Sequence, residues 1–143
     1  MTRRSTGVVT PAGFITLREA CGLTQHETGL YLHCTLRAVQ NWEGGTRGIP
    51  DAAARALQDL DALIRERVSE IVLPLSEKNV TVTVPLIRYR SDEAYAASHR
   101  AEETGLPRQA YHAMLWRAMD AITRLGHEYR VDWADGTGQT AEA

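Results

Sequence analysis

Three side chains of the kinds that hydrogen bond to nucleotide bases stand close together in the first half of this sequence. Arg37, Gln40 and Asn41 fall at positions i, i+3 and i+4, so they share one face of a helix. In the major groove of DNA, Arg pairs with guanine and Asn or Gln pairs with adenine through two hydrogen bonds. Val39 and Trp42 fall on the opposite face, which predicts a buried side. A polar face that is only solvated is the alternative interpretation of the three residues.

The residues around this helix predict two short helices that meet across a tight turn. Thr24 and Glu27 form a capping box, in which each side chain bonds to the backbone amide of the other residue. Gly29 leaves room for a second helix to cross close by. Thr35 is the predicted N-cap of that second helix, and the glycines at 44 and 45 end it.

The stretch from Leu23 to Pro50 follows a known pattern. The matching residues are Leu23-Thr24-Gln25, Gly29, Thr35, Trp42-Glu43, Gly45 and Pro50. With these residues the stretch resembles the lambda-repressor-like (XRE-type) helix-turn-helix family, which also pairs an Arg of its first helix with the Glu of the WE dipeptide, here Arg18 with Glu43. Thr28 departs from the usual leucine. His33 replaces the usual turn glycine, and His is among the residues that enter the left-handed region more readily than most.

This resemblance implies that the partner is double-stranded DNA. Leu36 is expected to join Arg37, Gln40 and Asn41 at the base edges. The residues expected to contact phosphates are Thr24, Gln25, Thr35, Thr46 and Arg47.

The distribution of charge favours a DNA-facing first half. The chain of 143 residues has a net charge of −2. Residues 1–50 carry five arginines and three glutamates, whereas residues 51–143 carry 11 basic and 15 acidic residues. The first half therefore has a small positive excess that suits phosphate contact, and the acidic half is expected to face away from DNA. Arg3 and Arg4 would extend the positive patch as a tail or an arm.

The remaining pattern predicts a mainly α fold in two domains. A first helix from Pro11, capped by Thr10, and a long helix from Asp51 to about Val72 complete an N-terminal domain of four to five helices over residues 1–72. A strand with Pro85 at an edge or bulge, a helix from Ser91 to Thr104, a helix from Pro107 and a strand over 127–133 predict a small α+β (strand-helix-helix-strand) domain over 73–133. Residues 134–143 are expected to be a disordered tail.

The second domain is expected to form a homodimer. A two-stranded sheet alone is marginally stable in water, and the apolar stripe of the long helix exceeds what a small N-terminal core can bury. Because the two features leave apolar surface for a second chain, we expect the interface to lie between Ile64 and Trp133. The predicted interface residues are Ile64, Val82, Val84, Leu86, Tyr89, Trp116 and Trp133.

The order of these elements is similar to that of the anti-CRISPR-associated autorepressors of phages and mobile elements. This resemblance implies a homodimer that represses its own operon from an inverted repeat. Two alternatives stay open: an antitoxin-type regulator that also binds a toxin, and an RNA-binding regulator that uses the same Arg37 helix. An enzyme is not expected, because Glu93, His99, Glu102 and His112 lack a nucleophile, a phosphate loop or metal-site spacing around them.

No metal, cofactor or membrane contact is expected. Cys21 and Cys34 are the two cysteines, and although His26 and His33 lie near Cys34 in sequence, the spacing does not match a zinc site. No run approaches the about 20 apolar residues of a spanning helix, and residues 1–10 contain no long apolar segment. We therefore expect a cytoplasmic protein.

Overall fold

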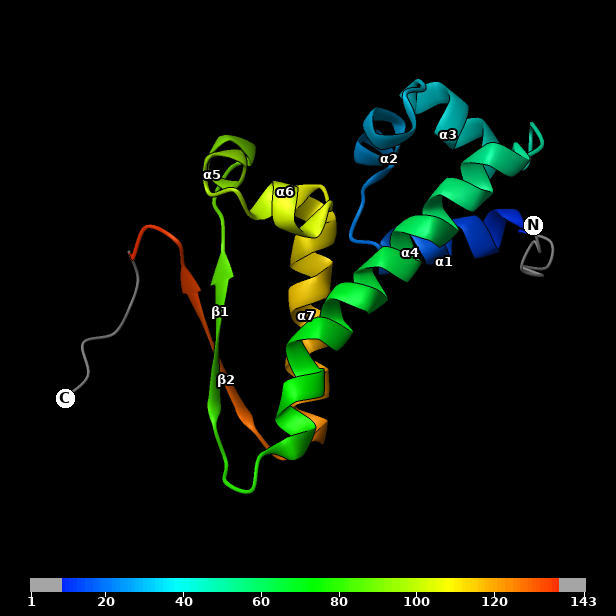
Figure 1. The fold of residues 1–143 in the computed structure, drawn as a ribbon. Coiled ribbons are helices and arrows are strands. Elements are labelled where there is room, and N and C mark those ends of the chain that lie inside the picture. Colours follow the sequence, from blue (N-terminus) through cyan, green and yellow to red (C-terminus); the bar gives the residue numbers. More distant parts are fainter. Residues whose placement is uncertain (1–8, 137–143) are drawn as a thin grey trace. The chain divides into compact units, whose positions relative to one another are not determined.

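The structure, a computed structural model, describes residues 9–136. The chain divides into two compact units, residues 1–62 and residues 63–143 (Figure 1). The division falls inside the long helix α4, Asp51–Val72, and not at its end as we predicted. The apolar stripe of α4 continues past Ala62, so successive turns of one uninterrupted helix contribute to different units. Arg3 and Arg4 lie outside the described residues.

Three short helices precede α4 in the first unit: α1, Pro11–Ala20; α2, Gln25–Leu32; and α3, Leu36–Glu43. Each begins after a threonine whose hydroxyl accepts a hydrogen bond from the backbone amide three residues on, at 3.0 to 3.1 Å. These residues are Thr10, Thr24 and Thr35, as the sequence predicts. The capping box of Thr24 and Glu27 is complete, because the Glu27 carboxylate accepts from the Thr24 amide at 3.0 Å. The helix starts are therefore set by local side-chain chemistry.

Buried residues from all four helices form the core of the first unit, and those from α1, α3 and α4 are apolar. Phe14, Val39 and Leu57 are fully buried, and the Phe14 and Trp42 rings pack edge to face with centroids 5.9 Å apart. Thr28, which departs from the usual leucine, is also fully buried. Its hydroxyl donates to the backbone carbonyl of its own helix four residues earlier, at 2.8 Å, so its one polar group does not remain unpaired in the core.

The second unit is built around a two-stranded sheet. After the short 3-10 helix η1, Leu73–Glu77, come β1, Thr83–Arg88, and the helices α5, Asp92–Ala97; α6, Arg100–Thr104; and α7, Arg108–Arg124. The last strand, β2, Glu128–Trp133, pairs with β1 in parallel over its whole length. The described residues are thus mainly helical with one small sheet, and the long helical connection is what a parallel strand pair requires.

The segment between Ser91 and Thr104 is the main departure from the predicted elements. We expected one helix, but α5 ends at Ala97, Ser98 is its C-cap, and His99 adopts a left-handed conformation with φ 66°. The Ser98 hydroxyl donates to the Tyr95 carbonyl at 2.6 Å and accepts from the Arg100 amide at 3.1 Å. These bonds replace the helical ones, because a serine hydroxyl can compete for nearby backbone groups.

One face of α7 supplies much of the core of the second unit. Its buried residues are Ala110, Tyr111, Met114, Leu115, Ala118 and Ile122. Tyr111 packs against Tyr89 and Tyr95 with ring centroids 5.1 to 5.7 Å apart, and its hydroxyl donates to the Ile87 carbonyl of β1 at 2.6 Å. Burial raises the pKa of Tyr111 to about 12. This tyrosine cluster joins the sheet to the helices.

The end of the described chain is more ordered than we expected. Residues 134–136 form a turn, in which the Ala134 amide donates to the Arg88 carbonyl at 2.9 Å and Asp135 pairs with Arg90 at 2.9 Å. The Arg90 guanidinium also stacks on the Trp133 ring, 3.9 Å from its centroid. The prediction of a disordered tail is therefore wrong for these three residues. The rest of the predicted tail, residues 137–143, lies outside the described part of the chain. Among the described helices, none has the length and apolar character needed to cross a membrane.

Candidate nucleic-acid interface

The turn between α2 and α3 brings the two helices into close contact. His33 ends α2 in the left-handed conformation, with φ 57° and ψ 44°, as predicted for this turn position. The Cys34 amide then donates to the Gly29 carbonyl at 2.9 Å. A Cβ on Gly29 would lie 3.0 Å from the Cys34 carbonyl oxygen, so only glycine fits here without a shift of the turn. The close crossing that the sequence predicts from Gly29 is confirmed.

Helix α3 has one buried face and one polar face. Val39 is fully buried, and Trp42 is half-buried against Phe14. Arg37 and Gln40 are exposed on the other side. The predicted division of the two faces is confirmed, and two of the three side chains that could recognise bases are open to solvent.

Leu36 lies in the first turn of α3 and is 40% exposed. An apolar side chain at this exposed position adds a methyl-bearing surface next to Arg37. Such a surface can contact the methyl group of thymine, so its exposure suits the predicted role.

A buried ion pair fixes α3 against α1. The Arg18 guanidinium donates to both carboxylate oxygens of Glu43, at 2.7 and 3.1 Å, and the two side chains are only 12% and 6% exposed. Arg18 also donates to the Leu23 carbonyl at 3.0 Å. The pairing expected from the resemblance is therefore present. Glu43 is a structural residue on a helix whose other face is polar.

Gln25 belongs to the same network, which the sequence did not indicate. Its side-chain amide donates to Glu43 at 2.9 Å, so that one carboxylate ties α1, α2 and α3 together. We predicted that Gln25 contacts a phosphate. Within the side chain, only the second hydrogen of the amide nitrogen could donate to a phosphate, since the first is directed to Glu43.

The loop after α3 engages two more of the predicted site residues. The Asn41 carbonyl accepts from the backbone amides of Thr46 and Arg47, at 3.0 and 3.3 Å. The Thr46 hydroxyl lies 3.2 Å from the Asn41 carbonyl oxygen and 3.3 Å from the Asn41 Oδ1. Asn41 and Thr46 thus help to close the loop, whereas Arg47 is exposed. The Asn41 amide nitrogen keeps its hydrogens for a partner outside the loop, because Thr46 approaches the oxygen.

The capping threonines keep a donor for a ligand. The hydroxyls of Thr24 and Thr35 act as acceptors toward the helix amides, and both residues are exposed. A hydroxyl that accepts one bond still has its own hydrogen to donate. Both residues also stand at the positive ends of helix dipoles, where an anion is stabilised. Their placement suits the predicted phosphate contacts.

The predicted dimer residues lie in different environments. Ile64 is fully buried, and Leu86 and Tyr89 are each 5% exposed, so these three belong to the protein's own core and offer no surface to a second chain. Trp116 is 66% exposed. Val82, Val84 and Trp133 are half-buried. We correct the prediction for the first three: strand and helix periodicity marks an apolar face but does not say whether the same chain covers it.

Two exposed apolar residues of β2 were not among the predicted interface residues. Tyr129 is 39% exposed and Val131 is 36% exposed. The alternation over 127–133 that predicts the strand also places these two side chains on one face. That alternation was the signal that could have identified them.

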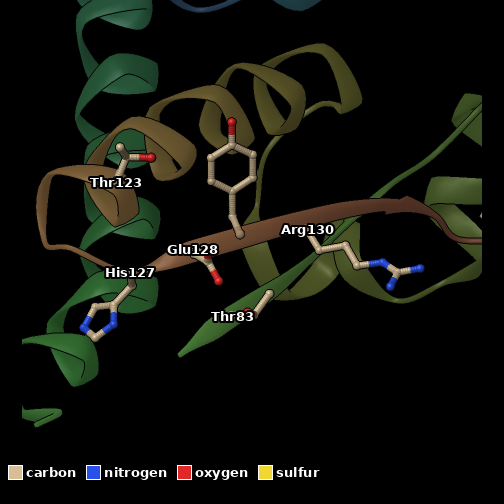
Figure 2. Close-up of a pocket in the computed structure, with 6 residues that line it drawn as sticks. Thr83, Thr123, His127, Glu128 and Arg130 are labelled. Carbon is tan, nitrogen blue, oxygen red and sulfur yellow. The ribbon is translucent and has the colours of Figure 1, made fainter. Parts of the chain in front are cut away.

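A polar hollow of about 690 Å³ lies where the two strands begin. Figure 2 shows Thr83 of β1 beside Glu128 of β2, with Thr123 at the end of α7 and His127 before β2. The His127 Nδ1 accepts from the Val82 amide at 3.2 Å, so Nε2 carries the proton and donates to the Leu75 carbonyl at 3.1 Å. The imidazole therefore holds backbone segments together and is not placed as a catalytic base.

The two cysteines are buried or half-buried. Burial raises the pKa of the Cys34 thiol, which keeps it protonated. Among the described residues, no group of three or more His, Cys, Asp or Glu side chains is arranged to hold a metal ion.

No protein-family model matches this chain, and no curated protein shows significant sequence similarity to it.

Proposed function

We propose that this protein is a sequence-specific DNA-binding repressor that places α3 in the major groove. The observation that supports this most is the exposed pair of Arg37 and Gln40 on a helix whose opposite face is buried at Val39. Arg37 is the second residue of α3. In proteins of this type, the N-terminal residues of the recognition helix are those that contact the base edges. Gln40 and the Asn41 amide follow on the same face, and Leu36 would contact a thymine methyl.

Phosphate contacts flanking the base contacts would fix the register of the helix on the duplex. The hydroxyls of Thr24 and Thr35 and the exposed guanidinium of Arg47 are the groups that support this part of the proposal. Contacts to phosphate position a protein without selecting sequence, so their loss should weaken binding to all duplexes alike. The network of Arg18, Gln25 and Glu43 would keep the helix rigid enough to select bases.

The proposed repressor acts as a homodimer on an inverted repeat. One helix contacts too few base pairs to mark a single genomic site, and proteins of this type place two recognition helices about one helical turn, roughly 34 Å, apart. Joining two binding units can raise avidity by about 10²- to 10⁴-fold. Following the resemblance to anti-CRISPR-associated autorepressors, the proposed operator lies in the protein's own operon, in the cytoplasm of the host cell.

Double-stranded DNA is favoured over RNA as the ligand. The major groove of an A-form RNA helix is deep and narrow, so side chains on a helix cannot reach its base edges unless the stem is distorted. An antitoxin-type regulator would need, in addition, a surface for a toxin. No contact in the described residues indicates such a surface.

Selection from a library of random duplexes by the full-length protein tests the proposal. We expect enrichment of an inverted repeat, and competition by RNA of the same sequence at least about tenfold weaker than by duplex DNA. Arg37→Ala should cost about 1 to 3 kcal/mol per half-site with an unchanged thermal midpoint. Arg124→Ala, which removes the same charge from a side chain that is 78% exposed in the second unit, is the matched control and should bind normally.

The absence of any enriched sequence, or sequence-specific binding by a folded Arg37→Ala protein, would contradict the proposed use of α3. Preferential competition by RNA would favour the RNA-binding alternative. Copurification of one small partner protein whose removal restores DNA binding would favour the antitoxin alternative.

A further inference from the structure

The outer edge of β2 has backbone groups that point away from β1. The Glu128 amide donates to the Val82 carbonyl at 3.0 Å, and the Ala134 amide donates to the Arg88 carbonyl at 2.9 Å. In a parallel pair the residues that bond to one neighbour alternate along the strand, so the residues of β2 that face β1 are the even-numbered ones from 128 to 134. The N–H and C=O groups of Tyr129 and Val131 and the N–H group of Trp133 therefore point to the outer edge, whereas the Trp133 carbonyl already accepts from the Gly136 amide at 3.0 Å. In the described residues, the sheet has no third strand there.

The outer edge of β1 is closed to a further strand. By the same alternation, Thr83, Pro85 and Ile87 direct their backbone groups away from β2. Pro85 has no N–H to donate, and the Ile87 carbonyl already accepts from the Tyr111 hydroxyl at 2.6 Å. Proline at such a position is one of the ways in which proteins prevent strand addition. Among the described residues, the β2 edge is therefore the more open of the two to a further strand.

The side chains of β2 are also less covered than those of β1. The first four residues of β2 are all exposed, including Tyr129 and Val131, whereas β1 has the buried Leu86. An exposed edge strand with apolar side chains tends to pair with another strand. Two strands alone are marginally stable, so pairing would also stabilise the sheet.

We infer that β2 pairs antiparallel with β2 of a second copy of this chain across a twofold axis. The result is a four-stranded sheet with the two β2 strands at its centre. This pairing rests on the proposed function, because that function requires two copies of the chain. It adds the surface that would join them. The two chains would be related by an isologous contact, in which each surface binds itself.

The order of charges along β2 is what favours a second copy over another partner. When two β2 strands pair across a twofold axis normal to the sheet, the residue at the axis faces the same residue of the second copy. If that residue is Arg130 or Asp132, two like charges oppose each other at the centre. If it is Val131, Arg130 of each copy faces Asp132 of the other, and Tyr129 faces Trp133. The strand is therefore complementary to its own antiparallel copy.

The register centred on Val131 also gives the longest pairing. Centring on Tyr129 avoids like charges too, because Glu128 would face Arg130, but Val131 would then face His127, which precedes the strand. Of the two registers that avoid like charges, the one centred on Val131 gives every residue of β2, Glu128–Trp133, a facing residue between Glu128 and Ala134 of the other copy. The backbone groups of Val131 would then bond directly to those of Val131 in the other copy.

The charged face of β2 can accommodate this pairing. Arg130 and Asp132 of one strand already pair at 3.0 Å, and the two side chains are 42% and 18% exposed. Figure 2 shows the Arg130 side chain extending outward from β2. Addition of the second strand would place four side chains in a square of alternating charge.

Sedimentation equilibrium of the full-length protein without DNA, combined with charge exchange, tests the interface. Arg130→Asp places a carboxylate opposite Asp132 of the other copy and should raise the dimer dissociation constant about tenfold or more. Asp132→Arg should do the same. The double variant with both changes restores opposite charges and should return the dissociation constant to within about threefold of the original. Because the two residues also pair within one strand, a mixture of the two single variants separates the roles: a heterodimer should form, since its facing pairs have opposite charges although the pairs within each strand do not.

Cross-linking gives a second readout that does not depend on charge. In an antiparallel hydrogen-bonded pair the facing Cα atoms are about 5.5 Å apart, which is within the range of a disulfide. Val131→Cys should therefore form a covalent dimer on mild oxidation. Glu128→Cys, which is also exposed on β2 but distant from its own copy in this register, is the matched control and should not.

Each outcome separates this inference from the proposed function. A monomeric full-length protein at micromolar concentration would overturn the inference, as would a dimer that both Arg130→Asp and Val131→Cys leave unaffected. Efficient cross-linking through Tyr129→Cys in place of Val131→Cys would overturn the register. If the protein showed the expected charge rescue but selected no DNA sequence, the repressor proposal would be contradicted and this interface would still be supported.

Discussion

The Arg18 guanidinium donates hydrogen bonds to both oxygens of the Glu43 carboxylate, which lies 25 residues away in sequence, and Gln25 donates to the same carboxylate. Because both charges are almost completely buried, the removal of one partner leaves the other unpaired in a poorly solvated site. Arg18→Met should destabilise the fold by about 3 to 5 kcal/mol in urea unfolding. Combination with Glu43→Leu should recover part of this loss. If the stability lost in the double variant equalled the sum of the losses in the two single variants, the pair would not be coupled.

Trp42 is expected to be structural although it lies on the same helix as Arg37. Its ring packs edge to face on Phe14, so Trp42→Ala should lower the free energy of unfolding by about 3 kcal/mol. Trp116→Ala makes the same substitution at a residue that is 66% exposed and should change stability by less than about 0.5 kcal/mol. If Trp42→Ala were as stable as the original protein but failed to bind DNA, the two faces of α3 would be assigned the wrong way round.

Gly29 and Gly48 should respond oppositely to alanine. A Cβ on Gly29 would meet the Cys34 carbonyl oxygen at 3.0 Å, and the backbone must shift, so Gly29→Ala should cost about 1 to 3 kcal/mol in spite of the better helix propensity of alanine. A Cβ on Gly48 meets nothing within 4 Å, and Gly48→Ala should be neutral or slightly stabilising. Thermal unfolding of the two variants checks this, and a Gly29→Ala protein more stable than the original would show that the turn can yield.

His112 should make the stability of the protein depend on pH. Burial, with the nearby Arg88 and Arg108, lowers its pKa to about 4, and its Nε2 finds no hydrogen-bond partner among the described residues. Asp92 and a backbone bond to Tyr89 act in the opposite direction. The unfolded chain binds a proton at this ring near pH 6.5, as the ordinary pKa requires. Between these values the unfolded state holds more protons, so the stabilisation is complete above pH 6.5 and is lost as the pH falls toward 4.

Urea unfolding at pH 7.5 and at pH 5 measures this effect. His112→Asn should lose less stability between the two pH values than the original protein does. His26→Asn, at an exposed position on α2, is the control and should keep the original dependence. An unchanged pH dependence in His112→Asn would assign the acid sensitivity to the carboxylates.

The starts of the first three helices were predictable from the sequence because the deciding interactions are local, whereas the break between α5 and α6 at His99 was not predicted. The Thr10, Thr24 and Thr35 hydroxyls each bond to an amide only three residues away, so residue type and spacing fix where a helix starts. The left-handed conformation of His33 and the end of α6 at Gly105 follow from backbone preferences of the same short range. The polar face of α3 could also be predicted, since helical periodicity alone places Arg37 opposite Val39.

Only the tertiary structure decided which apolar surfaces are covered and how distant polar groups pair. Alternation predicts a strand equally well for parallel and antiparallel neighbours, so the parallel register of β1 and β2 had to be observed. Periodicity likewise marked Ile64, Leu86 and Tyr89 as apolar-face residues, but their burial in the chain's own core depends on elements far away in sequence. Gln25 turns to Glu43 because folding brings α2 and α3 together, and no local pattern contains that contact.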